Sequence, residues 1–385
     1  MNRRALSLVA CLTLAYAGMT APARGYVLNR TVGSSGGCPQ LSRLKIALNS
    51  IDRRWSTSPS SSIRTTSGAW TGSPQQTEIA ASIARSFDAW VNVAGTTLTP
   101  GTLAPLQTTA TQSACAFTDG RNTICFNQSD SGFTTGVLAF TRVVSALAVG
   151  ETAGAKRATF VGEILDADIF FKPGDSSATF ATPGALTSSH YDLETVLTHE
   201  LGHFFGISHS SVWRAMMWPF VPTKGLFTGD RPIAQRPDAP LADDDRVGLR
   251  ILYPDANDTV NRGTISGRVL PANPEVAGLP AGVTGIFGAH VVAVDADTGA
   301  VVAGTFAGLT CSPSGLPTRF DGGYVLERLP LGRNYKIYAE PMDGPTDAGH
   351  ISLFLDSLCR SGTNNACTVD PKNIFNTNFT TRVRP

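Results

Sequence analysis

The chain has 385 residues, 42% of them hydrophobic, and its 31 basic and 30 acidic residues give a formal charge of +1. That length allows two or three domains and a sizeable buried core. Because the charges balance and form no basic block, we expect no nucleic-acid partner.

The first 23 residues have the pattern of a secretion signal. Two arginines precede an apolar run from Ala5 to Met19, and small residues up to Ala23 offer a cleavage site. We therefore expect a secreted protein whose mature chain begins at residue 24. Lipid attachment at Cys11 is an alternative, but cleavage there would leave an apolar run of only about six residues. The sequence contains no later run of about eighteen apolar residues, so we expect no transmembrane helix.

The cysteines indicate disulfides. Seven occur in the chain, and Cys11 is the one inside the signal, so an even number follows it, as is usual in exported proteins that form disulfides. Cys115 and Cys125 flank a turn at Asp119-Gly120, and a hairpin there would bring them together. Cys359 and Cys367 are also close in sequence. The connectivity stays open at this point.

The first half of the chain predicts strands and one long helix. An alternating run at 44–48 indicates a strand, and 78–91 carries apolar side chains at helical spacing. Two further apolar runs, at 136–141 and 161–171, indicate strands. The pattern predicts a helix packed against a sheet.

The run from His199 to His209 has the residues of a catalytic zinc site. His199 and His203 are four residues apart, so on a helix their imidazoles lie on one face and can share a zinc ion. Gly206 lets the backbone leave the helix with positive φ and bring back His209 as a third ligand. Three protein ligands leave one position open for water, as in catalytic zinc sites. Glu200 is placed to act as the general base on that water.

The second half of the chain predicts a helix and then a series of strands. Residues 241–253 have a helical pattern that Pro254 stops, and the polar run at 255–262 reads as a linker. Beyond it, short alternating runs are separated by Gly, Pro and Asp, which is typical of a β-sandwich. These runs are 265–269, 289–294, 300–306, 324–329 and 335–340.

The histidine run, together with Met216 and Met217 downstream, resembles the signature of the metzincin zinc proteases, and of their matrixin branch in particular. The resemblance implies an α+β fold for residues 24–254, with a twisted mixed sheet and an active-site helix. It implies that Met217 forms a hydrophobic floor under the metal without binding it. It also implies that Asp244 and Asp245 support the methionine turn.

The resemblance further implies where substrate binds. Pro219 and Val221 would wall the pocket for the residue after the scissile bond, and Leu138 and Ala139 would border the cleft. If their strand is the exposed edge of the sheet, an extended substrate can add to it as a further strand. An ordinary buried strand is the alternative.

We expect one catalytic Zn²⁺ and no second one. In the matrixins a histidine on the cleft strand helps to hold a structural zinc, and Phe140 takes its place here. His190 is the one histidine before the motif, so that second site lacks its ligands. Asp166 and Asp168 alone do not make a calcium cage, so Ca²⁺ has no support from the sequence.

Residues 263–385, which follow the linker, resemble the transthyretin-like regulatory domains of carboxypeptidases, in the runs 288–299 and 321–324. We therefore predict a secreted zinc endopeptidase that cleaves protein or peptide substrates as a monomer. An all-β sandwich follows its catalytic domain in the sequence. One alternative is a surface-binding or polymer-binding protein in which the sandwich binds and the protease fold is a scaffold. Another is an inactivated protease.

Overall fold

A computed structural model describes most of the chain between residues 63 and 340, with the backbone of short strands elsewhere. The proposed signal at 1–23 and the cysteines Cys38, Cys115, Cys359 and Cys367 lie outside the described segments, so export and disulfide pairing stay predictions. None of the described helices is both long and apolar enough to cross a membrane. The segments described are 63–69, 73–98, 118–126, 132–173, 179–221, 223–230, 234–272, 285–286, 288–307 and 322–340.

The helices form where the sequence pattern is helical. Helix α2 begins before the predicted start at residue 78, at a Ser-Pro pair of the kind that is common in a first helical turn. Its apolar stripe, which includes Ile83, Phe87 and Trp90, is buried. The described helices are α2 (Ser73–Val91), η4 (Pro183–Ala185, a 3-10 turn), α3 (Leu193–Phe204) and α4 (Asp243–Leu252).

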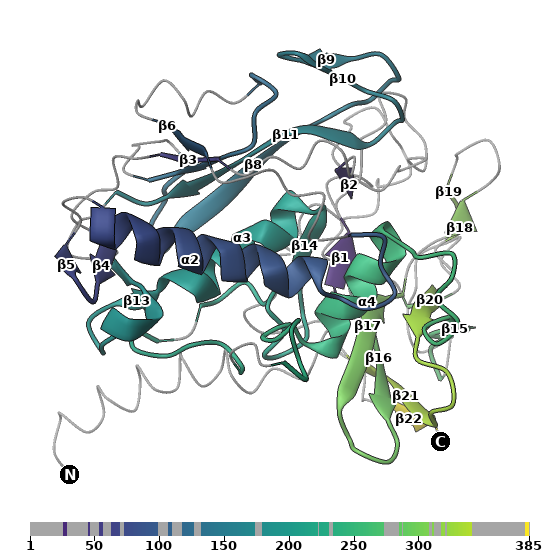
Figure 1. The fold of residues 1–385 in the computed structure, drawn as a ribbon. Helices are drawn as coiled ribbons and strands as arrows, with labels where there is room; N and C mark the ends of the chain where they lie inside the picture. The colour runs from purple at the N-terminus through teal and green to yellow at the C-terminus, as the bar shows by residue number, and fades with distance from the viewer. Residues whose placement is uncertain are drawn as a thin grey trace, which may run out of the picture.

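A mixed sheet lies on one side of helices α2 and α3, as the predicted α+β fold requires (Figure 1). Its central strand, β11 (Glu163–Phe171), is buried along its whole length. The strand β8 (Ala139–Ser145) pairs with β11 in antiparallel, whereas β2 (Lys45–Ile46) and β7 (Thr123–Cys125) pair with it in parallel. The sheet continues in parallel from β7 to β3 (Arg54–Ser56) and β6 (Gln107–Thr109).

Strand β8 behaves as an edge strand in the part of the chain that the structure describes. Its recorded strand partner is β11, and each of its seven residues is half-buried, in contrast to the full burial of β11. Its other neighbour is helix α3, which packs against it. This arrangement favours the edge-strand interpretation over the buried-strand one.

Further described strands of this half of the chain form smaller sheets. The strand that follows α3, β14, pairs in antiparallel with a strand from the start of the chain, β1. The remaining strands of this half form a β9–β10 hairpin and a sheet in the order β13, β12, β4, β5. Their bounds are β1 (Tyr26–Leu28), β14 (Ile207–Ser210), β9 (Thr152–Ala153), β10 (Lys156–Arg157), β13 (Tyr191–Asp192), β12 (Phe180–Ala181), β4 (Ile63–Thr65) and β5 (Gly68–Ala69).

Helix α3 is fixed from one side by helix α2, which lies beside it in Figure 1. The indole Nε1–H of Trp90 donates to the carbonyl oxygen of Thr198 at 2.8 Å. The ring of Phe87 meets that of Phe204 edge to face, with centroids 5.7 Å apart. These buried contacts hold the middle and the end of α3, the helix that carries the histidine motif.

The C-terminal runs form strands where the alternation predicts them. One sheet has the order β17, β16, β21, β22, and a second pairs β15 with β20. A short β18–β19 pair lies beside them in the sequence. The bounds are β15 (Gly263–Arg268), β16 (His290–Asp295), β17 (Val301–Phe306), β18 (Thr310–Cys311), β19 (Pro317–Arg319), β20 (Gly323–Leu329), β21 (Tyr335–Glu340) and β22 (Arg382–Arg384).

These strands share a hydrophobic core with helix α4, which runs next to β17 (Figure 1). Val247 and Leu249 of α4 belong to the same buried cluster as Val302 and Ala303 of β17. The polar run at 255–262 is hydrogen-bonded on both sides, from Asp255 N–H to the carbonyl of Gly95 at 3.1 Å and from Leu331 N–H to the carbonyl of Val260 at 2.8 Å. The C-terminal strands are therefore in direct contact with the part of the chain that carries the histidines.

Candidate metal centre

Helix α3 presents the first two histidines. Its N-terminus is capped by Asp192, whose carboxylate accepts the Thr195 N–H at 2.8 Å, as expected for an aspartate at this position. His199 and His203 follow on one face, and Glu200 lies between them in sequence. The local sequence thus forms the helix, while the contacts with α2 hold it.

Gly206 turns the chain at the end of α3. Its φ is +96°, a conformation that only glycine adopts without strain. The chain then runs back as β14, which carries His209. The turn predicted from the sequence is present, and it returns His209 to the other two histidines.

The three imidazoles form a compact cluster. Their ring centroids are 4.9–5.3 Å apart, and one possible ligand atom from each lies within 4.8 Å of the others. In the described part of the chain, His199, His203 and His209 are the one group of three or more metal-ligating side chains. His190 lies elsewhere, with its Nδ1 2.8 Å from the Thr187 hydroxyl.

Backbone carbonyls determine which ring nitrogens of His199 and His203 are available to bind a metal. The Nδ1 of His199 is 2.8 Å from the carbonyl oxygen of Met216, and the Nδ1 of His203 is 2.8 Å from that of Ile207. A carbonyl oxygen only accepts, so both Nδ1 atoms must carry the proton. The lone pairs are then on the two Nε2 atoms. Metal-binding histidines are commonly oriented by such bonds to the backbone.

The surroundings keep these imidazoles neutral. Burial lowers the pKa of His199, while burial together with the neighbouring His209 and His199 lowers the pKa of His203 well below its usual range. Neutral imidazoles are the form that binds metal. Three imidazole donors in a compact cluster fit a zinc ion with one coordination position left open.

Glu200 lies beside this cluster in a buried position, with 4% of its surface exposed. Burial raises the pKa of its carboxyl to about 7, and a hydrogen bond from Thr141 acts in the opposite direction. The Thr141 hydroxyl is 2.7 Å from Glu200 Oε2 and 3.0 Å from the Glu200 carbonyl oxygen. Strand β8 therefore touches the predicted general base directly.

Met217 is fully buried against helix α3. A Cβ placed on Gly202 would lie 2.0 Å from the Met217 sulfur, so the absence of a side chain at Gly202 gives the thioether its space. Gly202 directly precedes His203, so Met217 lies below the helical segment that carries two of the histidines. The role of Met217 as a hydrophobic floor under a metal stays a prediction.

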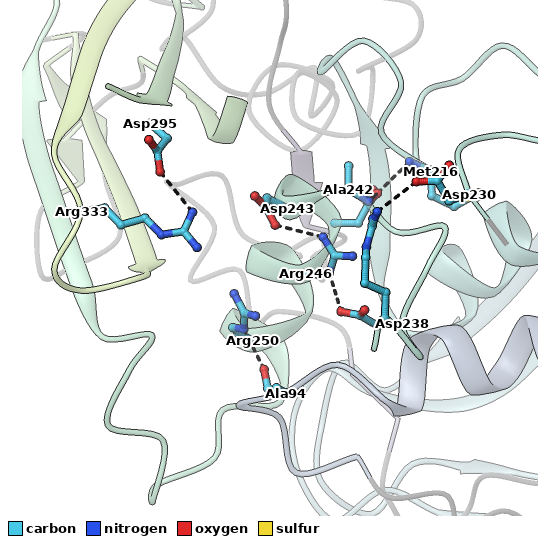
Figure 2. A network of polar contacts seen from close by, with 12 residues as sticks. Ala94, Met216, Asp230, Asp238, Ala242, Asp243, Arg246, Arg250, Asp295 and Arg333 are labelled. Atoms are coloured by element: carbon cyan, nitrogen blue, oxygen red, sulfur yellow. Dashed lines mark hydrogen bonds and ion pairs between the residues drawn. The ribbon is translucent and has the colours of Figure 1, made fainter. Parts of the chain in front are cut away.

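Asp245 supports the methionine turn. Its carboxylate accepts the backbone N–H groups of Met216 at 2.7 Å and Met217 at 3.1 Å, and that of Ala242 at 2.8 Å. Figure 2 shows this part of α4, where Arg246 is paired with acidic residues on the neighbouring loop and on its own helix. The carbonyl oxygen of Met216 also accepts a hydrogen bond from His199 Nδ1. By holding Met216, Asp245 therefore helps to hold the His199 ring.

Asp244 connects the histidine strand to the C-terminal strands. Its carboxylate accepts the Ser210 hydroxyl at 2.7 Å and the Gly304 N–H of β17 at 2.8 Å, and the side chain has no exposed surface. Ser210 directly follows His209. One buried aspartate thus bonds both the residue after the third histidine and the C-terminal sheet.

The four predicted pocket residues are half-buried and lie on two segments. Ala139 begins edge strand β8 and Leu138 directly precedes it, whereas Pro219 and Val221 follow the methionine turn. Leu138, Ala139 and Val221 also pack against the main core. Their role as pocket walls stays a prediction.

Aromatic side chains occupy the position where the matrixins have the histidine of a structural zinc site. The ring of Phe140 stacks on Phe170 at 5.1 Å and meets Phe133 edge to face at 4.8 Å. The guanidinium of Arg142 lies 5.4 Å from the Phe140 ring centre. An apolar cluster of this kind fills the space without donating metal ligands.

Asp166 and Asp168 point into the protein and hold the loop before β7. They accept the N–H groups of Gly120 and Thr123 at 2.9 and 2.8 Å. Burial and the charge of Asp166 raise the pKa of Asp168 to about 8. A calcium ion at this pair stays without support.

Sequence reasoning did not identify three contacts at this centre. Thr141 and Gly304 gave no motif, and the contacts of Thr141, Ser210 and Gly304 join residues that are close only in the fold. The histidines, by contrast, were identified by spacing alone.

Comparison with known proteins agrees with this geometry. Residues 70–254 match the matrixin family. A segment of 66 residues is 41% identical to Metalloendoproteinase 1 of Glycine max, over 17% of this chain and 18% of that protein. A segment of 93 residues is 34% identical to Metalloendoproteinase 1-MMP of Arabidopsis thaliana, over 21% of this chain and 22% of that protein. The chain spans about a fifth of the length of these two curated relatives. Residues 70–254 are therefore the part of the chain that is similar to the matrixins.

Proposed function

We propose that the chain is a zinc-dependent endopeptidase that hydrolyses peptide bonds in protein or peptide substrates. The observation that carries the proposal is the cluster of His199, His203 and His209, with ligand atoms within 4.8 Å of one another and Glu200 beside it. The matrixin match and the names of the two plant relatives support the same reaction class.

Different residues of the site bind the metal, transfer the proton and orient the histidine rings. When bound by the three imidazoles, zinc supplies a Lewis acid that polarises the scissile carbonyl and makes water acidic. Glu200 takes a proton from the attacking water and delivers it to the leaving amine, as a general base and then a general acid. The carbonyls of Met216 and Ile207 hold the histidine rings in orientation. Burial of Glu200 keeps bulk water away from its carboxyl group.

Substrate would lie along the edge strand β8 as an added strand. The half-burial of β8 and its single recorded strand partner support this placement. Main-chain hydrogen bonds would then hold the peptide, and side-chain pockets would select it. Pro219 and Val221 would wall the pocket after the scissile bond.

Further features of the proposal rest on sequence patterns. We propose that the enzyme acts outside the cytoplasm because residues 1–23 have the signal pattern. We propose that the C-terminal strands form an accessory β-sandwich. The Gly304 bond to Asp244 supports a role for them in holding the catalytic part.

The test is the Glu200→Gln variant beside the unchanged full-length chain. We expect both to bind one zinc per chain, and only the unchanged chain to cleave a quenched-fluorescence peptide library. Glu194→Gln is the matched control, since it makes the same change on the same helix at a residue that pairs with Arg85. Retained cleavage by Glu200→Gln would disprove the assigned role of Glu200.

A further inference from the structure

One contact at the centre lies outside the metal ligands and the predicted pocket. Thr141, on edge strand β8, reaches Glu200 on α3 with the two distances given above, 2.7 Å to the carboxylate and 3.0 Å to the main-chain carbonyl. The two residues are 59 positions apart in the sequence. A single hydroxyl therefore contacts both the backbone and the reactive group of the proposed general base.

The chemistry of a hydroxyl suits that position. It has one proton to donate and two lone pairs with which to accept. When the Glu200 carboxylate is ionised, Thr141 can donate to it. That bond, at 2.7 Å, limits rotation of the carboxyl group.

We propose that Thr141 is a positioning residue that holds the Glu200 carboxyl group in its working orientation. This inference rests on the proposed function. It adds that the strand along which substrate would bind also orients the general base, through one hydroxyl group. A carboxyl group with free rotation would spend part of its time turned away from the attacking water, and so turnover would fall while substrate binding would not.

The fold does not depend on this hydroxyl. Helix α3 is held independently by the Trp90 bond to Thr198 and by its Asp192 cap. Strand β8 is held by its pairing with β11 from Ala139 to Ser145. Valine has the same shape as threonine and is favoured in strands, so Thr141→Val removes the hydroxyl and keeps the packing.

The experiment compares full-length, zinc-loaded Thr141→Val and Thr141→Ser with the unchanged chain. A lost hydrogen bond to a carboxylate predicts a fall of about tenfold in kcat for Thr141→Val, with KM within about twofold. Serine keeps the hydroxyl, so Thr141→Ser should stay within about threefold of the unchanged kcat. Zinc content should be the same in all three, and a thermal midpoint above the assay temperature checks that each variant is folded. Thr96→Val, which removes a hydroxyl bonded only to the Val93 carbonyl in the described contacts, should have no effect on kcat.

Two results would overturn the proposal. One is an unchanged kcat in Thr141→Val, and the other is an equal loss in Thr141→Ser, which would mean that the hydroxyl is not what matters. Crystal structures of the zinc-loaded proteins give a readout without turnover. We expect the Glu200 carboxyl group to leave its place in Thr141→Val while the three histidines stay. If the unchanged chain cleaves nothing, that displacement would still support Thr141 although the proposed function had failed, and an unmoved carboxyl group would refute it.

Discussion

Replacing Asp244 by alanine tests whether its buried hydrogen bonds stabilise the fold around the metal centre. Among the described contacts, its carboxylate accepts hydrogen bonds from Ser210 and from Gly304, at a site with no exposed surface. A buried donor that loses its acceptor costs about 1–3 kcal/mol, so the two together give roughly 2–6 kcal/mol. Removing a buried charge offsets part of that cost. We therefore expect Asp244→Ala to lower the free energy of unfolding by about 2–4 kcal/mol.

The neighbouring Asp243 is the matched control. It is on the same helix, but its side chain is 38% exposed and its described partner is Arg246, at 3.0 Å. Exposed pairs of this kind contribute about 0–1 kcal/mol. Asp243→Ala makes the same chemical change to α4 without touching Ser210 or Gly304. It should therefore change the free energy of unfolding by less than about 1 kcal/mol.

The assay is urea unfolding followed by tryptophan fluorescence at a fixed excess of zinc, since bound metal adds to apparent stability. Zinc affinity is measured in parallel, because Ser210 directly follows His209. We expect Asp244→Ala alone to lose stability and both variants to keep their zinc affinity, since the three histidines come from one local segment. If the two variants lie within about 0.5 kcal/mol of each other, the bridge through Asp244 does not support the fold as we argue.

Three further outcomes follow from the described contacts. Gly202→Ala places a methyl group against the Met217 sulfur, and overpacking of this kind should lower stability by about 1–3 kcal/mol in urea unfolding; an unchanged midpoint would show that Met217 can move aside. The raised pKa of Asp168, about 8 against an ordinary 3.8, means that the folded chain holds a proton that the unfolded chain releases, so the free energy of unfolding should fall as pH rises from about 4 to 8. Asp168→Asn should flatten that decline, and identical pH slopes would contradict the assignment. Removing zinc with a chelator should lower the thermal midpoint and restoring zinc should recover it, whereas a midpoint indifferent to zinc would argue against a bound ion.

The sequence predicted what depends on neighbours along the chain. The spacing of His199 and His203 predicted a shared helix face, and Gly206 predicted the turn that returns His209, because both features are local. The alternating runs predicted the C-terminal strands for the same reason. The start of α2 was placed too late because the apolar stripe begins after the first turn, although Ser-Pro marked it.

The sequence did not predict contacts between distant segments. Thr141 meets Glu200 across 59 positions, and Asp244 meets Gly304 across 60. No periodicity joins such pairs, because they are brought together by strand pairing and helix packing. The polar run at 255–262 shows the same limit, since its polarity gave no sign of its backbone hydrogen bonds to Gly95 and to Leu331.

These distant contacts have a consequence for how the centre works. The three histidines come from one segment, 199–209, so metal binding requires little beyond local structure. The orientation of Glu200 and the support of the strand after His209 come from elsewhere, through Thr141 and Asp244. A change that damages only these supports should therefore leave a protein that binds zinc but turns over slowly. Loss of the C-terminal strands is such a change, because it removes the Gly304 donor from Asp244 and uncovers the apolar face of α4. The catalytic part is thus expected to need those strands for full activity, even though none of them carries a metal ligand or the general base.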